Sequence, residues 1–114
     1  MTASYDEGAA LFRAMGHPVR LQILNMLRGG EVCVCHMETA FDRRQAYISQ
    51  QLMVLREAGL IAARKDGLKV FYRLADPRVD ALVEMALGLQ HVGEPETLDN
   101  CACPHCATAR MEIA

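Results

Sequence analysis

The spacing of apolar positions predicts a mainly helical chain. Along much of the sequence, apolar side chains recur every three or four positions, as one buried face of a helix requires. The helices expected from this pattern cover residues 4–16, 18–29, 32–41, 42–59 and 76–89. Ser4, Asp42 and Asp76 are residue types that cap helix starts, and Pro18 suits a first helical turn.

The fourth predicted helix divides into an apolar side and a polar side. Its expected buried residues are Ala46, Ile48, Leu52, Leu55 and Ala58. Gln45, Ser49 and Gln50 lie elsewhere on the helix and carry neutral donors and acceptors. Four methionines fall within apolar helical patterns, so we expect them to fill the core rather than bind metal; they are Met15, Met26, Met53 and Met85.

The spacing changes between the fourth helix and the last. Apolar and β-branched residues at 60–62 and 70–74 flank Asp66-Gly67, a dipeptide typical of tight turns, so a two-stranded hairpin is expected. The order helix, short helix, helix, hairpin is that of a winged helix-turn-helix. The predicted fold class is therefore mainly α with a β-hairpin wing.

The last helix is apolar on more than one face, which is more than a lone small domain needs to bury. This excess predicts a homodimer through the terminal helices. The expected domain spans residues 1–92. Residues 93–114 contain two prolines and no sustained periodicity, so we expect a flexible, Cys-rich C-terminal tail.

Length and composition fit one small domain. A chain of 114 residues can form one core but not two, and 52% apolar residues with only 5% aromatic residues favour helices over sheets. No apolar run approaches the ~20 residues that a membrane span needs. Asp6 and Glu7 stand where a signal peptide would be basic. We therefore expect a soluble, cytoplasmic protein.

Charge is unevenly distributed along the chain. Residues 43–73 carry seven basic residues against two acidic ones, although the whole chain has a net charge of −2. One basic segment on an otherwise acidic protein indicates a surface that binds a polyanion. The alternative is an ordinary amphipathic helix beside a solvated charged loop.

Double-stranded DNA is the partner that these features favour. Gln can pair with adenine edges in the major groove, Ser can bond a base or a phosphate, and Arg and Lys suit phosphates. The candidate DNA-binding residues are Arg43, Arg44, Gln45, Tyr47, Ser49, Gln50, Gln51, Arg64, Lys65 and Lys69.

Three stretches resemble motifs of the ArsR/SmtB family of metal-sensing repressors. Residues 15–24 (MGHPVRLQIL) look like its second-helix signature, and residues 49–60 (SQQLMVLREAGL) resemble its recognition helix and exit. Residues 31–35 (EVCVC) are similar to the cysteine motif of its arsenic and cadmium/lead sensors. The resemblance covers about residues 8–92, with Gln51 where many members carry His. It implies a homodimeric winged-helix repressor that leaves its operator when an inducer binds.

Five cysteines are the candidate metal ligands. They are Cys33, Cys35, Cys101, Cys103 and Cys106. Their odd number and a reducing cytosol argue against a disulfide framework. Arsenite-type ions favour three thiolates and cadmium or zinc usually four ligands, so the first pair needs at least one tail cysteine from either protomer. His105 is either a fourth ligand or a spectator, and the tail group could instead hold a separate structural zinc.

The expected inducer is a soft metal(loid) ion, arsenite or antimonite, cadmium or lead, with no organic cofactor. Two thiolates at i and i+2 of a regular helix point to nearly opposite sides, so shared coordination requires an extended or frayed segment there. This segment leads into the predicted recognition helix, so we expect coordination to distort the segment and disturb DNA binding.

Two other functions fit the cysteines. A repressor of the same fold could sense oxidants or sulfide through a disulfide or persulfide. A small thiol oxidoreductase or arsenate reductase would need a reactive cysteine in a phosphate-type loop or a Cys-x-x-Cys at a helix start. Only Cys103 and Cys106 have that spacing, and Pro104 interrupts them, so we do not expect an enzyme.

Overall fold

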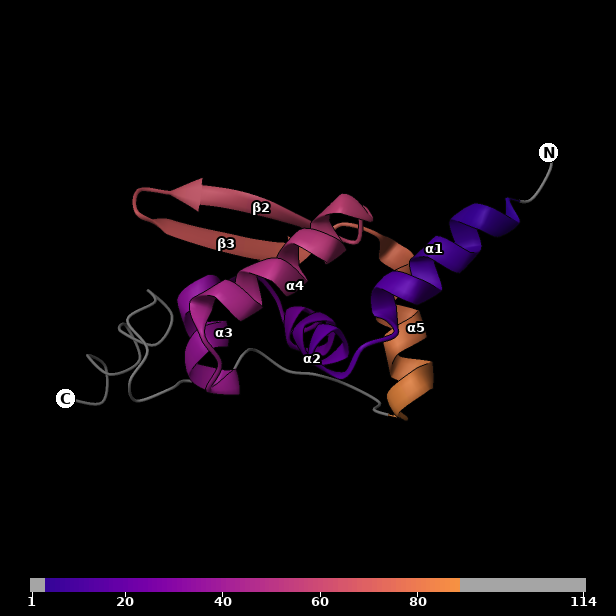
Figure 1. Ribbon diagram of the computed structural model, residues 1–114, viewed down its shortest axis with the longest axis horizontal. Coiled ribbons are helices and arrows are strands. Elements are labelled where there is room, and N and C mark those ends of the chain that lie inside the picture. The colour runs from indigo at the N-terminus through magenta and orange to yellow at the C-terminus, as the bar shows by residue number, and fades with distance from the viewer. Residues whose placement is uncertain (1–3, 89–114) are drawn as a thin grey trace.

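A computed structural model describes residues 4–88 as a winged helix-turn-helix (Figure 1). The elements in chain order are α1 (Tyr5–Met15), α2 (Pro18–Leu27), β1 (Val32–Cys33), α3 (Val34–Phe41), α4 (Gln45–Glu57), β2 (Ile61–Asp66), β3 (Lys69–Leu74) and α5 (Pro77–Leu87). The expected domain end at residue 92 and the tail 93–114 lie outside the described residues. None of the helices between residues 4 and 88 has the length and apolar character needed to cross a bilayer.

Local side-chain chemistry starts three of the helices. Ser4 Oγ accepts a hydrogen bond from the Glu7 N–H at 3.2 Å, and the Asp76 carboxylate accepts one from the Arg78 N–H at 2.9 Å. At α2, Pro18 occupies the first turn, and His17 Nδ1 accepts a hydrogen bond from the Val19 N–H at 3.1 Å. These starts agree with the sequence prediction, and His17 adds a cap that the residue preferences do not single out.

The start of α4 differs from the prediction. Asp42 does not cap this helix; it follows α3 in the left-handed conformation, with φ 49° and ψ 48°. The residue before α4 is Arg44, which makes no side-chain capping bond. Asp both caps helix starts and tolerates left-handed backbone better than most residues. The same residue type therefore suits the start of one helix or the end of another, and the sequence alone did not distinguish them.

The sheet has three antiparallel strands in the order β1-β3-β2. The predicted hairpin is confirmed, but Asp66 pairs with Lys69, so Gly67 and Leu68 form its two-residue loop. Gly67 has φ +62°, the left-handed region that glycine occupies without strain. Strand β1 was not predicted, because two residues are too few to show an alternating pattern.

The core forms where α2 packs against α1, α4 and α5. In Figure 1, α2 lies below α4, the β2–β3 hairpin extends to one side, and α1 and α5 lie at the opposite end. The largest fully buried side chains are Ile23, Leu24, Met37, Ile48, Leu52, Leu55, Leu60, Val79 and Val83.

Four residues that the sequence assigned to the core are exposed instead. Ala46 lies on the outward side of α4, and Ala58 ends that helix in solvent. Met53 and Met85 are also exposed, whereas Met15 is buried as expected. Alanine and methionine are tolerated on either side of a helix, so their hydropathy did not locate them.

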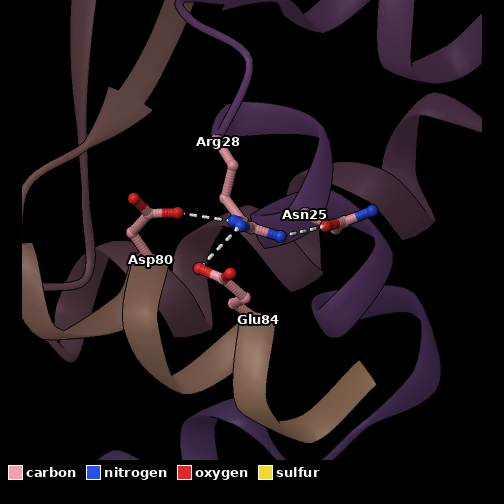
Figure 2. A network of polar contacts seen from close by, with 4 residues as sticks. All are labelled: Asn25, Arg28, Asp80 and Glu84. Atoms are coloured by element: carbon pink, nitrogen blue, oxygen red, sulfur yellow. Dashed lines mark hydrogen bonds and ion pairs between the residues drawn. The ribbon is translucent and has the colours of Figure 1, made fainter. Parts of the chain in front are cut away.

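A buried arginine joins α2 to α5 (Figure 2). The Arg28 side chain is only 4% exposed; its Nε donates to Asp80, one terminal nitrogen lies 3.5 Å from Glu84, and the other donates to Asn25 at 3.2 Å. The two carboxylates stand one turn apart on α5 and face the guanidinium from the same side. This network fixes where α5 lies against the helix-turn-helix.

Candidate nucleic-acid interface and thiol segment

The exposed surface of α4 carries three of the predicted DNA-binding residues, Gln45, Ser49 and Gln50. Because Ile48, Leu52 and Leu55 are buried, the opposite side of the helix is set by its 100° step per residue. That side presents a ridge of exposed residues at helical spacing, Ala46, Gln50, Met53 and Glu57, with Gln45 and Ser49 exposed beside it. Gln45, Ser49 and Gln50 are therefore accessible together on one helix.

Tyr47 and Gln51 are half-buried and support their neighbours. The guanidinium carbon of Arg43 lies 5.2 Å from the centroid of the Tyr47 ring, a cation–π distance. Gln51 Oε1 accepts a hydrogen bond from Arg20 at 3.0 Å, so its amide oxygen faces α2. Arg43 and Arg44 themselves are exposed immediately before α4.

Arg20 is a positioning residue that the sequence prediction missed. Besides Gln51, its guanidinium donates to the backbone oxygens of Ala14 and Arg13 at the end of α1. One half-buried side chain thus ties α1, α2 and α4 together. The available signal was a charged residue inside a mainly apolar helical run, where a charge needs partners.

The wing carries the remaining predicted cations, but one of them is already paired. Arg64 donates to both carboxylate oxygens of Glu31, at 2.6 and 3.1 Å, and stacks on the Phe71 ring at 4.7 Å. The hydrogen bond from Arg64 lowers the pKa of Glu31. Lys65 is exposed and Lys69 is half-buried at the hairpin end.

The two described cysteines lie on different elements. Cys33 is buried, 2% exposed, in β1, where it pairs with Phe71 of β3. Its backbone is extended (φ −74°, ψ 145°) and precedes α3, whereas Cys35 is half-buried in the first turn of that helix. The backbone is therefore extended at Cys33 but helical at Cys35, and coordination of one ion by both thiolates stays a prediction. His36, which follows, is buried.

The described residues alone do not form a complete metal site. Within residues 4–88 there is no group of three or more His, Cys, Asp or Glu side chains able to hold an ion. The other predicted ligands, Cys101, Cys103 and Cys106, fall outside the described residues, as does His105. Two thiols match the donor chemistry of a soft ion but give fewer ligands than arsenite, cadmium or lead prefers.

The sequence is similar to those of known transcriptional regulators. The family model described as bacterial regulatory protein, arsR family, matches residues 17–63. The arsenical resistance operon repressor of Escherichia coli strain K12 is 44% identical over 72 residues, 62% of this chain and 61% of the relative. The transcriptional activator HlyU of Vibrio cholerae is 37% identical over 85 residues, 75% of this chain and 79% of the relative.

Solved structures of such regulators share the fold. Reduced HlyU from Vibrio cholerae has a TM-score of 0.70 at 36% identity, covering 75% of this chain and 92% of that one. A homodimeric winged helix-turn-helix DNA-binding domain from Mycobacterium bovis has a TM-score of 0.67 at 32% identity, covering 73% of this chain and 77% of that one. The predicted fold is confirmed.

Proposed function

This chain belongs to the arsR family of bacterial regulatory proteins, and we propose that it is a cytoplasmic repressor that binds operator DNA as a homodimer. A soft thiophilic ion, arsenite or antimonite, cadmium or lead, releases the repressor by binding cysteine thiolates. The observation that carries the DNA-binding part is the joint exposure of Gln45, Ser49 and Gln50 on α4, directly after two exposed arginines. A helix of this kind fits the major groove, and the arginines fit its phosphates.

Exposed apolar side chains on the terminal helices support the homodimer. Tyr5 and Phe12 of α1 and Met85 and Leu87 of α5 face solvent in the single chain. Large apolar side chains left exposed on a single chain fit an interface between two copies, and a two-fold dimer places two reading helices on successive half-sites of a palindrome. The Mycobacterium bovis domain, which is homodimeric, has the same fold.

The thiol segment, residues 33–35, supports release by a soft ion. Cys33 and Cys35 supply two thiolates, and we propose that at least one of Cys101, Cys103 or Cys106 completes the site. The similarity to a repressor of an arsenical resistance operon supports the same class of inducer.

The contacts around Cys33 suggest how coordination reaches the wing. Cys33 is buried in β1, so binding an ion together with Cys35 requires β1 to move relative to β3. Its partner on β3 is Phe71, whose ring supports Arg64, and Arg64 holds Glu31 just before β1. Movement of β1 therefore disturbs the base of the wing as well as the segment leading to α4.

A second candidate signal is oxidation. Two thiols that lie near one another can lose two electrons and two protons to hydrogen peroxide, giving a disulfide and two molecules of water. One solved structure of the related HlyU is that of the reduced protein, which makes oxidation a signal worth testing for this chain. In this alternative the repressor and its DNA surface are unchanged and only the inducer differs.

One experiment separates these signals. A duplex selected from a randomised pool is bound by the reduced full-length chain under anaerobic conditions, and fluorescence anisotropy follows the complex. Arsenite, cadmium and lead are titrated in parallel with peroxide and polysulfide, while thiolate–metal absorbance reports ion binding. Release by an ion, together with its absorbance, supports the proposal. Release only by peroxide or polysulfide supports the alternative.

Substitution of the cysteines tests their role. Cys33→Ser and Cys35→Ser should each keep operator binding and lose release by the ion. If either substitution abolishes DNA binding by the ion-free protein while the fold is retained, the thiols are structural and the sensor assignment is wrong.

The wing coupling has its own matched pair of variants. Glu31→Gln removes the charge that holds Arg64 near β1, whereas Asp66→Asn removes a carboxylate 3.7 Å from the same guanidinium at the hairpin end. We expect Glu31→Gln to keep ion absorbance but weaken release, and Asp66→Asn to behave as wild type. Full release by Glu31→Gln would show that the signal does not pass through this pair.

A further inference from the structure

The outward ridge of α4 begins with an apolar side chain that the sequence had placed in the core. Ala46 is exposed in the first turn, and Gln50 follows it one turn later on the same side. We propose that the Ala46 methyl reads the 5-methyl group of a thymine in each operator half-site, while Gln50 bonds an adjacent adenine. This inference rests on the proposed DNA-binding function and adds a specificity-determining residue to it.

The position of Ala46 brings it close to base edges. In helix-turn-helix proteins the N-terminal residues of the reading helix contact the bases. Arg43 and Arg44 precede α4 directly, and Arg43 is held by its contact with the Tyr47 ring. Arginines bound to phosphates here would fix the start of the helix at the groove, and the short Ala46 side chain would let the backbone approach closely.

The chemistry of the ridge favours an A·T step. A methyl group neither donates nor accepts a hydrogen bond, so opposite a guanine or cytosine edge it would leave polar groups without partners. Thymine alone among the bases offers an apolar group in the major groove, and apolar contact with alanine is a known way to read it. Gln50 can bond both N6 and N7 of adenine.

Replacing thymine by deoxyuridine removes only the methyl group, and this isolates the proposed contact. In a selected operator, each thymine pair related by symmetry is changed to deoxyuridine in turn, and binding is measured with wild type and Ala46→Gly. Burying one methyl group strengthens binding about fourfold. At the thymine position that Ala46 contacts, deoxyuridine in both half-sites removes two such contacts and should weaken wild-type binding roughly fifteenfold. Ala46→Gly should bind the thymine and deoxyuridine duplexes equally.

Two further variants control for effects of the substitution itself. Ala58→Gly makes the same change at the exposed far end of α4 and should keep the wild-type response to deoxyuridine. Ala46→Ser keeps a side chain at the position if Ala46→Gly proves too unstable, and thermal unfolding by circular dichroism checks that each variant is folded. Ala46→Ser should also lose most of the discrimination, because its hydroxyl is polar.

The outcomes separate this inference from the function on which it rests. If no duplex is enriched from the pool, both fail. If the protein binds an operator but no thymine position responds to deoxyuridine, only the methyl contact is overturned. A response that persists in the Ala46 variants also overturns it, because another residue then reads the methyl group.

Discussion

The Arg28 network predicts an asymmetry between removing its cation and removing its anions. The Arg28 side chain is 4% exposed, whereas those of Asp80 and Glu84 are 61% and 45% exposed. In Arg28→Met the carboxylates left behind can be solvated by water, and the methionine still packs on the core. In the double variant Asp80→Asn, Glu84→Gln, a buried positive charge keeps only dipolar partners.

The magnitudes follow from this difference in burial. Removing the partners of a buried charge lowers the free energy of unfolding by about 3–5 kcal/mol. We expect about 3 kcal/mol for the double variant, because its amides can still accept hydrogen bonds from Arg28. Arg28→Met should cost about 1–2 kcal/mol, since it loses hydrogen bonds to partners that are already largely hydrated. Arg78→Met is the control: its side chain is 66% exposed beside Asp76, and its loss should cost at most about 1 kcal/mol.

Urea unfolding followed by circular dichroism measures all three variants. Protein concentration must be fixed, because the stability of the proposed dimer depends on it. If Arg28→Met proves as costly as the double variant, or more so, then burial of the charge is not what makes this network matter, and the reasoning fails.

Three other local features give testable expectations. Asp76→Ala removes the cap of α5 and should lower the free energy of unfolding, measured in urea at neutral pH, by about 1 kcal/mol. A hydrogen bond from Arg78 lowers the pKa of Asp76, so the stabilisation from the Asp76 charge is full above about pH 4 and is lost as the pH falls through the depressed pKa. The stability difference between variant and wild type should therefore shrink in acid. Arg20→Met should weaken operator binding while its salt dependence stays unchanged, because this residue positions α4 through Gln51 rather than contacting phosphate, and a reduced slope of log affinity against log salt would contradict that role. Gly67→Ala should destabilise the wing by about 1–2 kcal/mol, since φ is +62° there, and thermal unfolding unchanged from wild type would refute the strain argument.

Much of the candidate DNA surface could be predicted from the sequence. The polar residues of α4 and the basic hairpin were identified from residue type and helical spacing, and the structure exposes Gln45, Ser49 and Gln50 together. Hydropathy did not show that Ala46 belongs with them, because a single methyl group costs little on either side of a helix. Gln51 was assigned to DNA by its residue type alone, and its partner Arg20 lies 31 positions away.

The sequence by itself determined the order of the helices and the hairpin, and most helix starts. Those features depend on groups within four residues of one another, such as Ser4 with Glu7 and Asp76 with Arg78, so residue type and spacing contain the needed information. The hairpin loop could also be predicted locally, because Gly67 adopts the left-handed backbone conformation that the loop requires without strain.

Only the tertiary structure decided how the thiol segment joins the wing and how α5 is anchored. Strand β1 exists because β3 is there to pair with it, and Glu31 meets Arg64 across 33 positions of the chain. Arg28 finds Asp80 across 52 positions. Such contacts form when packing brings distant segments together, and no local pattern of apolar and polar residues specifies which buried charge meets which partner.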